Sequence, residues 1–169
     1  PADALAAVVN QAAERGGMLV IPAFAVGRTQ ELLYHLRELE QAGRIPVLDV
    51  FVDSPMALDV TAITSSHLHE LDAEAAAVVR RGDRPLCPAK VHMVRDAAQS
   101  RAINAIAGPG IILSASGMCT GGRVKHHLRQ RPPDRRNTVC LAGFQAAGTR
   151  GRALQDGASE VWIYGERVP

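Results

Sequence analysis

Apolar residues recur along this chain with two different spacings, and these spacings predict helices that alternate with short strands. In residues 3–15 and again in residues 28–41, leucine, valine and alanine fall on one side of a helix of ordinary pitch. Short apolar runs that end at glycine, proline or polar residues predict strands instead. These runs are residues 18–21, 47–52, 91–94, 111–113, 138–142 and 161–164.

Further helices are predicted between the later strands, at residues 96–106, 122–130 and 149–156. Residues 56–81 are also predicted to be helical, in two pieces that break near residues 65–70. The alternation indicates an α/β fold with three layers, α/β/α, around a mostly parallel sheet of five to six strands. In such a sheet all strand carboxyl ends lie at one edge, where ligands bind.

Four loops follow a predicted strand and precede a predicted helix, so a parallel sheet would bring them to the same edge. Three of them combine glycine, a hydroxyl group and arginine beside the start of a helix. Glycine lets the backbone approach a ligand, free amide groups at the helix start hold an anion, and arginine adds a bidentate contact. This combination predicts a phosphate-binding edge, and the alternative is that the same residues form helix caps and tight turns. The loops are residues 22–30, 53–56, 114–123 and 143–152.

The composition is that of one globular domain. A chain of 169 residues, 47% hydrophobic and 21% charged, can bury a core. No apolar run reaches the length of a membrane span and no segment resembles a signal peptide, so no membrane partner is expected. Cys87, Cys119 and Cys140 have no paired spacing, which favours reduced thiols in a cytoplasmic protein. The chain begins with Pro1 rather than methionine, and we expect it to be part of a longer protein.

The net charge of +2 conceals an uneven distribution. Acidic residues outnumber basic residues by three in residues 1–122, whereas residues 123–152 hold eight arginine and lysine residues against the single acid Asp134. A concentrated basic stretch suits a polyanion such as nucleic acid. A solvated basic face is the alternative. Neither GxxxxGKS/T nor GxGxxG after a strand occurs, which disfavours nucleotide hydrolysis and dinucleotide binding.

The histidine residues do not form a recognisable metal site. Residues 67–72, HLHELD, resemble the beginning of an HxHxDH metal motif, but Leu71 and Asp72 stand where aspartate and histidine are required. The adjacent His126 and His127 would point in different directions on a helix, one toward the core and the other toward a phosphate. No Ser-His-Asp or Cys-His set has a suitable spacing, so no catalytic or metal-binding residue is predicted.

Taken together, the four loops resemble the β-CASP domain, which is inserted into the metallo-β-lactamase fold of RNA-processing nucleases. Its relatives include the nuclease subunit of the cleavage and polyadenylation specificity factor and, more distantly, ribonuclease J. The resemblance extends over nearly the whole chain. It rests on four segments in order, IPAFAVGRTQE (21–31), DSPMA (53–57), SASGMCTGGR (114–123) and GFQAAGT (143–149).

The resemblance implies a single Rossmann-like β-CASP domain over residues 1–169, flanked on both sides in a longer parent by a metallo-β-lactamase domain. That domain would carry two zinc ions that activate water for hydrolysis of RNA phosphodiester bonds. The expected partners are single-stranded RNA, held in the cleft between the domains, and the metallo-β-lactamase domain of the same parent chain; a homodimer of the parent is a further expectation. Because HxHxDH is absent, the chain alone is expected to bind no zinc and to be catalytically inactive.

Position by position, the resemblance assigns RNA or phosphate binding to nine loop residues. Two of the nine, the glycines, are expected to shape their loop, and Met56 and Met118 are expected to pack beneath the loops. The low aromatic content of 4% predicts little base stacking. Two alternatives remain, a free-standing α/β module for a small phosphorylated ligand and a non-catalytic scaffold. The nine residues are Arg28, Ser54, Ser116, Gly117, Gly121, Arg123, Gln145, Thr149 and Arg150.

Overall fold

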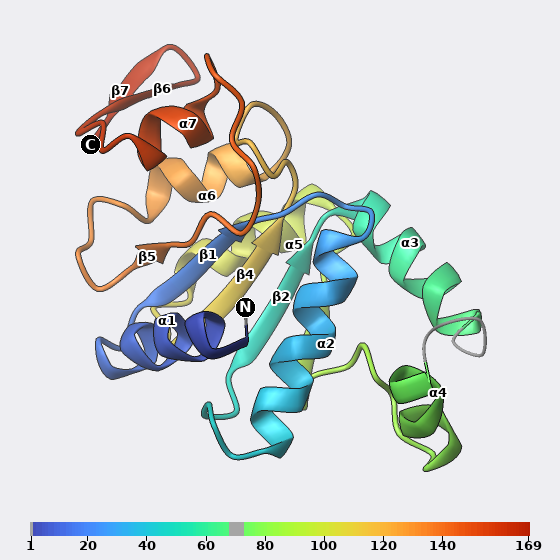
Figure 1. Cartoon of the computed structure of the whole chain (residues 1–169). Helices are drawn as coiled ribbons and strands as arrows, with labels where there is room; N and C mark the ends of the chain where they lie inside the picture. The colour runs from blue at the N-terminus through green and yellow to red at the C-terminus, as the bar shows by residue number, and fades with distance from the viewer. Residues whose placement is uncertain (1, 68–72) are drawn as a thin grey trace.

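The computed structural model describes residues 2–67 and 73–169, and a five-stranded sheet forms its centre (Figure 1). Every pair of neighbouring strands in this sheet is parallel. In spatial order the strands are β3 (Lys90–Met93), β2 (Asp49–Asp53), β4 (Gly110–Ser114), β1 (Met18–Pro22) and β5 (Thr138–Val139). The helices are α1 (Ala2–Glu14), α2 (Arg28–Gln41), α3 (Pro55–Ser66), α4 (Ala73–Arg80), α5 (Ala97–Ala102), α6 (Val124–Gln130) and α7 (Arg150–Gln155), with a 3₁₀ turn, η2 (Ile103–Ala105), after α5.

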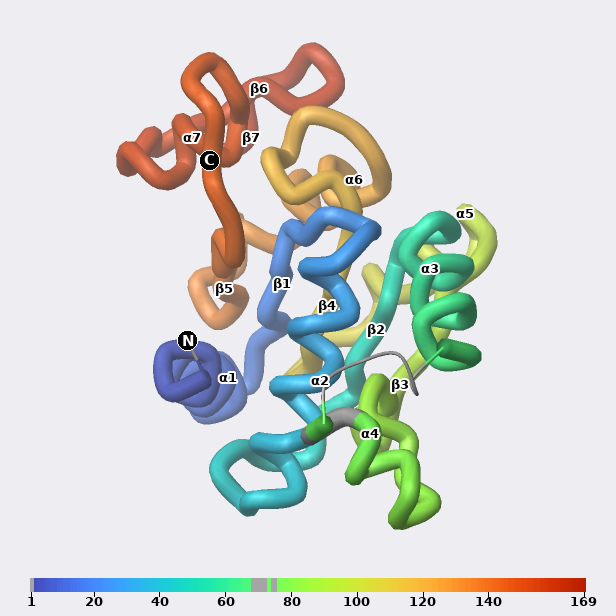
Figure 2. Tube along the Cα trace, turned by 45° about the vertical axis from the view of Figure 1, so that its right-hand side comes forward, coloured from blue at the N-terminus to red at the C-terminus, as the bar shows by residue number. Residues whose placement is uncertain are grey.

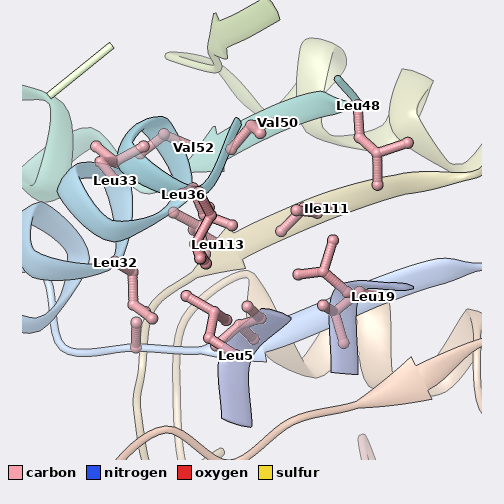
Figure 3. Packing of buried hydrophobic residues seen from close by; sticks show 14 of the residues in the cluster. Leu5, Leu19, Leu32, Leu33, Leu36, Leu48, Val50, Val52, Ile111 and Leu113 are labelled. Carbon is pink, nitrogen blue, oxygen red and sulfur yellow. The ribbon is translucent and has the colours of Figure 1, made fainter. Parts of the chain in front are cut away.

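Side chains of the central strands alternate between the two faces of the sheet, and each face has its own hydrophobic core. Leu19, Val50 and Ile111 point to the face covered by α1 and α2, where Figure 3 shows them gathered with leucine residues. Met18 and Ile112 point to the opposite face and pack in the core that includes α6. Strands buried on both faces are continuously apolar, as these are. The sheet therefore lies between two helical layers, and the predicted fold class is confirmed.

Helix α2 illustrates how the local sequence sets the bounds of an element. Gly27 has a φ of +81°, which glycine adopts without strain, and its amide donates to the side chain of Gln30 at 2.8 Å. A helix of this length gains most of its stability from packing, and each buried leucine contributes about 1.5–3 kcal/mol. The buried stripe consists of Leu32, Leu33, Leu36 and Leu39.

Several predicted bounds differ from the structure. The strand expected at residues 138–142 ends at Val139, although the Cys140 amide still donates to the carbonyl oxygen of Val20 in β1 at 2.9 Å. The helix expected at 96–106 is divided into α5 and η2. The helical stretch 56–81 is interrupted after α3, as predicted, and residues 68–72 lie outside the described part of the chain.

The last predicted strand, residues 161–164, does not join the parallel sheet, and that expectation is wrong. Instead, β6 (Val161–Ile163) pairs antiparallel with β7 (Glu166–Val168) in a separate hairpin. Tyr164 and Gly165 both have positive φ, 52° and 80°, as the tight two-residue turn of a hairpin requires. The short turn pairs β6 with β7, and neither strand pairs with a strand of the parallel sheet.

The hairpin and helix α4 lie at opposite ends of the molecule, as both views show (Figures 1 and 2). The hairpin packs against α6 and α7. Its buried side chains, Val161, Ile163 and Val168, extend the core on that face of the sheet. Among the described helices, none is both long enough and apolar enough to cross a membrane.

Candidate functional site

The carboxyl ends of the three central strands lie side by side. Pro22 at the end of β1 and Asp53 at the end of β2 both pair with Ser114 at the end of β4. The amide of Ala23 donates to the carbonyl oxygen of Ser114 at 3.0 Å, and the Ser114 hydroxyl donates to that of Asp53 at 3.0 Å. We call this end of the sheet, with the four loops 22–30, 53–56, 114–123 and 143–152, the carboxyl edge.

The loop after β5 reaches the carboxyl edge by packing on the loop after β4. The Gln145 side chain donates to the carbonyl oxygen of Gly117 at 3.0 Å, and the Gly151 amide donates to that of Met118 at 3.0 Å. A Cβ atom on Gly151 would lie 1.6 Å from Gln145 Oε1, so a larger residue there would displace the Gln145 side chain. The Phe24 ring of the first loop also lies against Gly117. The expected convergence of four loops at one edge is confirmed.

Beneath these loops the carboxylate of Asp53 is fully buried and accepts three hydrogen bonds. Its Oδ2 accepts from the Ser100 hydroxyl at 2.5 Å and from His127 Nε2 at 2.6 Å. Its Oδ1 accepts from Arg123 Nη1 at 2.8 Å. The donors belong to α5, α6 and the residue before α6. Asp53 therefore joins the end of β2 to the helices of the second face.

Burial and hydrogen bonding act on this carboxyl group in opposite directions. Burial raises the pKa of Asp53, but the hydrogen bonds from His127, Ser100 and Arg123 outweigh burial and hold the pKa below its ordinary value. The group is therefore ionised at neutral pH. Because its oxygens face donors of the same chain, it anchors the loops and is not placed to act as a general base toward a ligand.

Arg123, one of the residues assigned to RNA, is held by its own chain. Besides Asp53, its guanidinium group donates to the carbonyl oxygens of Val94 at 3.1 Å and Arg95 at 2.7 Å. These oxygens follow β3, so one side chain connects the ends of β2 and β3 to the loop after β4. Its main role in the structure is to position the carboxyl edge, and direct contact with RNA stays a prediction.

Arg150 has a similar position at the start of α7. Its guanidinium group donates to the carbonyl oxygens of Cys119 at 3.1 Å and Thr120 at 3.2 Å, and also to that of Trp162. Arg150 thus connects the loop after β4 to the hairpin. These contacts orient its donors toward carbonyl oxygens of the protein.

Two of the predicted hydroxyl residues are helix caps. Ser54 Oγ accepts from the Ala57 amide at the start of α3, and Thr149 Oγ1 accepts from the Arg152 amide at the start of α7, both at 3.2 Å. Ser54 and Gln145 are also buried, and their contact with RNA stays a prediction. These residues perform the alternative role considered from the sequence, that of capping and turn formation.

The glycines of the loop after β4 differ in whether a side chain would fit in their place. Gly117 shapes the loop as expected, because a Cβ atom there would meet the Phe24 ring at 3.0 Å. Gly121 is not constrained in this way, since no described atom lies within 4 Å of its Cβ position and its φ is not positive. The second loop-shaping glycine is Gly122, with a φ of +68° and a Cβ position 2.3 Å from the carbonyl oxygen of Ala115.

Arg28 and Ser116 are predicted polar residues that solvent reaches. The Arg28 side chain is 40% exposed and pairs with Glu31 at 2.7 Å. Ser116 is half-buried, and its hydroxyl accepts from the Gly121 amide at 3.2 Å. An exposed ion pair contributes little stability, so Arg28 can exchange its carboxylate partner for another anion at small cost.

Four large apolar side chains in the loops of the carboxyl edge are exposed to solvent. Phe24, Val26, Met56 and Phe144 are 42%, 64%, 62% and 76% exposed, and we call these four the apolar rim. The sequence suggested that Met56 packs beneath the loops, and that expectation is wrong because its side chain is exposed. Large apolar side chains that are exposed together on one side of a protein are typical of an interaction surface.

The chain has few aromatic residues, but most of them lie at the surface. Four of the six in the chain are large exposed hydrophobic residues, and none of these four lies in the two central cores. Phe24 and Phe144 belong to the apolar rim, and Trp162 and Tyr164 to the hairpin. The expectation of little base stacking rested on composition, which does not report where the rings lie.

Contacts within the protein use most of the positive charge of residues 123–152. Arg131 is buried and donates to the carbonyl oxygens of Ile103 and Ile106, both at 2.6 Å. The concentration of arginine is thus largely structural. Ion pairs at 2.6–2.9 Å join Arg129 to Glu166, Arg136 to Asp134 and Arg152 to Asp156.

Neighbouring histidines of α6 point in different directions, as predicted. His127 is buried against Asp53, whereas His126 is half-buried and its Nε2 accepts from the side chain of Asn104 at 2.9 Å. The HLHELD segment begins at His67, just after α3, and its other residues lie outside the described part of the chain. Over residues 2–67 and 73–169, no three His, Cys, Asp or Glu side chains form a group that could hold a metal ion.

The three cysteines are free, as expected. Burial raises the pKa of the Cys119 thiol to about 11, against a small opposing effect of Arg150. It also raises the pKa of Cys140. A buried thiol with a raised pKa is a poor nucleophile.

A model of the β-CASP domain matches residues 29–154. The chain belongs to the β-CASP family. It is 35% identical over 162 residues to the ribonuclease TTHA0252 of Thermus thermophilus and 36% identical over 160 residues to the transcription termination factor FttA of Methanosarcina mazei. It is also 30% identical over 161 residues to an RNase J-like protein of Methanocaldococcus jannaschii. These alignments cover 96%, 94% and 95% of this chain, but 37%, 25% and 36% of the relatives.

Sequence reasoning missed two features of this β-CASP domain. The first is the partnership of Asp53 with His127, although the spacing of His127 from the buried Val124 and Leu128 places all three on one side of α6. The second is the apolar rim. Its signal was present, because a large apolar residue such as Phe144 in a glycine-rich loop has no core to enter.

Proposed function

We propose that this β-CASP chain is the RNA-holding domain of a zinc-dependent ribonuclease and does not hydrolyse RNA by itself. The observation that carries the proposal is the carboxyl edge, where four loops meet and present exposed phenylalanine rings beside a basic side chain. The names of the relatives, ribonuclease and transcription termination factor, support RNA as the ligand.

The exposed side chains suit a single strand. Phe24 and Phe144 offer rings on which bases can stack, and such stacking contributes about 1–3 kcal/mol per base whatever the base. Arg28 and Ser116 offer a guanidinium and a hydroxyl group for phosphate oxygens. Few charges are available, because Arg123 and Arg150 are held internally. Binding should therefore be of moderate affinity, with little sequence preference and a shallow dependence on salt.

The proposal places the zinc ions in a metallo-β-lactamase domain of the same parent protein. The described residues of this chain do not fit the metal, since they contain no suitable group of ligands. Val26 and Met56 carry no ring for stacking, and we assign them to contact with that domain across the bound strand. In this proposal the carboxyl edge of the β-CASP domain is the surface that binds the RNA.

The test of RNA binding is an anisotropy titration of a labelled single-stranded oligoadenylate with the chain and with Phe144→Ala and Phe144→Leu. Stacking predicts that both variants bind roughly fivefold or more weakly, because leucine keeps an apolar side chain but not the ring. Binding by Phe144→Leu equal to that of the unmodified chain would show that the ring does not stack on a base. Absence of any binding at about 50 mM salt would contradict the proposal as a whole.

The predicted inactivity has a separate test. The purified chain is incubated with the same oligoadenylate and added zinc, and the products are resolved by length. We expect intact RNA. Cleavage that persists through purification and depends on zinc would place a catalytic centre within this chain and contradict the proposal.

A further inference from the structure

A pocket of about 340 Å³ lies beside the carboxyl edge, between α5, α6 and the hairpin. Its polar lining consists of Ser100, Arg101, Arg123, His126 and Tyr164. None of the nine residues assigned from the family resemblance lies in it except Arg123. The volume is within the range of pockets that hold small organic groups.

The charge of this pocket is positive. Arg101 is exposed, and its guanidinium group has no hydrogen-bond or ion-pair partner among the described residues. Lys125 is close to the pocket, because its Nζ lies 4.7 Å from the centre of the ring of Tyr164, a lining residue. The nearby carboxylate, Asp53, is already saturated by Arg123 and two further donors. The pocket lining contains Arg101 and no carboxylate, so an anion there would meet a cation.

The properties of His126 agree with this positive field. Burial lowers its pKa first, and the charges of His127, Arg101 and Arg131 lower it further, whereas Asp53 raises it. Its Nε2 accepts from Asn104, so in the neutral ring the proton is on Nδ1. His126 lines the pocket and carries this donor.

Tyr164 supplies a flat ring at the mouth of the pocket. The residue is 55% exposed and has a φ of +52° in the hairpin turn. A left-handed conformation costs an ordinary side chain about 1–2 kcal/mol, and asparagine fills such a turn position more readily. Tyrosine therefore occupies this position although another residue would adopt its backbone conformation more easily. The exposed face of the ring can stack on a base.

We propose that this pocket binds one nucleotide of a single RNA strand, with the base on the Tyr164 ring and the phosphate between Arg101, Lys125 and His126. The inference rests on the proposed function. The connection to the carboxyl edge is direct, because Gly122 and Arg123 line the pocket and also end the loop after β4. A strand that leaves the apolar rim along this loop enters the pocket next.

The experiment compares Tyr164→Asn and Arg101→Gln with the unmodified chain, using labelled oligoadenylate. Tyr164→Asn removes the ring but suits the turn, so affinity should fall roughly fivefold or more while the unfolding temperature does not fall. Arg101→Gln should weaken binding and reduce the slope of log K against log salt by about 0.7. Arg81→Gln is the matched control, because Arg81 is also exposed but follows α4 at the opposite end of the molecule.

If the chain binds oligoadenylate but both pocket variants bind as tightly as the control, the inference is overturned and the proposed function stands. If the chain binds no oligoadenylate, the proposed function fails and the pocket is tested with AMP alone. Shifts of the His126 ring resonances on addition of AMP, absent in Arg101→Gln, would still support a nucleotide site. No shift in the unmodified chain would overturn it.

Discussion

The inner and outer layers of the carboxyl edge carry side chains of opposite character. Beneath the loops lie an ionised Asp53, His127 and Arg123, all hydrogen-bonded to one another or to backbone oxygens. Above them, facing solvent, lie Phe144 and the other members of the apolar rim. The usual distribution, with polar groups outside and apolar groups inside, is reversed here.

This reversal indicates which residues hold the edge and which meet a ligand. Buried polar groups bonded to one another make a rigid frame, although His127 Nδ1 has no partner among the described residues, and removal of a charged member leaves unpaired charges. Exposed apolar side chains do not pack in the core, so they have little effect on the free energy of unfolding. The polar residues of the loops therefore build the site, and the exposed rings and the few free cations are its working surface.

Neutralising Asp53 should have the largest effect on the free energy of unfolding. Asp53→Asn leaves His127 and Arg123 without their carboxylate, and we expect a loss of about 3–5 kcal/mol in the free energy of unfolding. Asp49→Asn is the control, because Asp49 begins the same strand but pairs with the exposed His92 at 2.7 Å, and its loss should cost less than about 1 kcal/mol. Urea unfolding measures both. Equal effects would show that the inner layer is not the frame.

The same network predicts a pH dependence. The folded-state pKa of Asp53 is depressed, whereas in the unfolded chain it is about 4. The stabilisation is therefore complete above that value and is lost as the pH falls through the folded-state pKa. Urea unfolding between neutral and acidic pH should show a steeper loss for the unmodified chain than for Asp53→Asn. Parallel curves would contradict this assignment.

Substitution of the two adjacent glycines in the loop after β4 should change stability by different amounts. Gly122→Ala places a side chain at positive φ and 2.3 Å from a carbonyl oxygen, so we expect a loss of at least about 2 kcal/mol. Gly121→Ala has free space and should change stability by less than about 0.5 kcal/mol. Thermal unfolding of the two variants distinguishes them. A tolerated Gly122→Ala would show that the loop has another conformation.

A smaller effect is expected from the connection between the loop and the hairpin. Arg150→Ala leaves the carbonyl oxygens of Cys119 and Thr120 without a donor and should cost about 1–3 kcal/mol. Arg152→Ala removes an exposed ion pair with Asp156 and should cost less than about 1 kcal/mol. If Arg150→Ala unfolds like Arg152→Ala, its guanidinium group is free for RNA instead.

The outer layer should show the smallest effects on stability. Phe144→Ala and Met56→Ala remove side chains that lie mainly in solvent, and we expect changes within about 0.5 kcal/mol. Differential scanning calorimetry provides the measurement. A large loss in either variant would mean that the rim packs within the domain and is not an interaction surface.

The architecture could be predicted because it depends on local patterns. Continuous apolar strands and glycine-punctuated helices lead to a parallel sheet, and a parallel sheet brings four loops to one edge. The hairpin was misjudged because Tyr164 stands where a turn of this type normally has asparagine or glycine. Nothing in the pattern around Val161 distinguishes a hairpin strand from a sheet strand.

The roles of individual loop residues were harder to predict, because their partners are distant in sequence. Arg123 and His127 meet Asp53 across about seventy residues. An arginine in a glycine-rich loop has the same sequence signature whether it binds phosphate or a backbone oxygen. Ser54 and Thr149 form helix caps, so the more ordinary role is present at those positions, and RNA binding there stays a prediction.

Photochemical cross-linking tests the central claim most directly. A thiouridine-containing single strand is bound to the chain and irradiated, and the adducts are located by mass spectrometry. The account predicts adducts on residues 22–30 and 143–152, which carry the Phe24 and Phe144 rings. Adducts confined to α1, α2 or α4, with none on these loops, would contradict it.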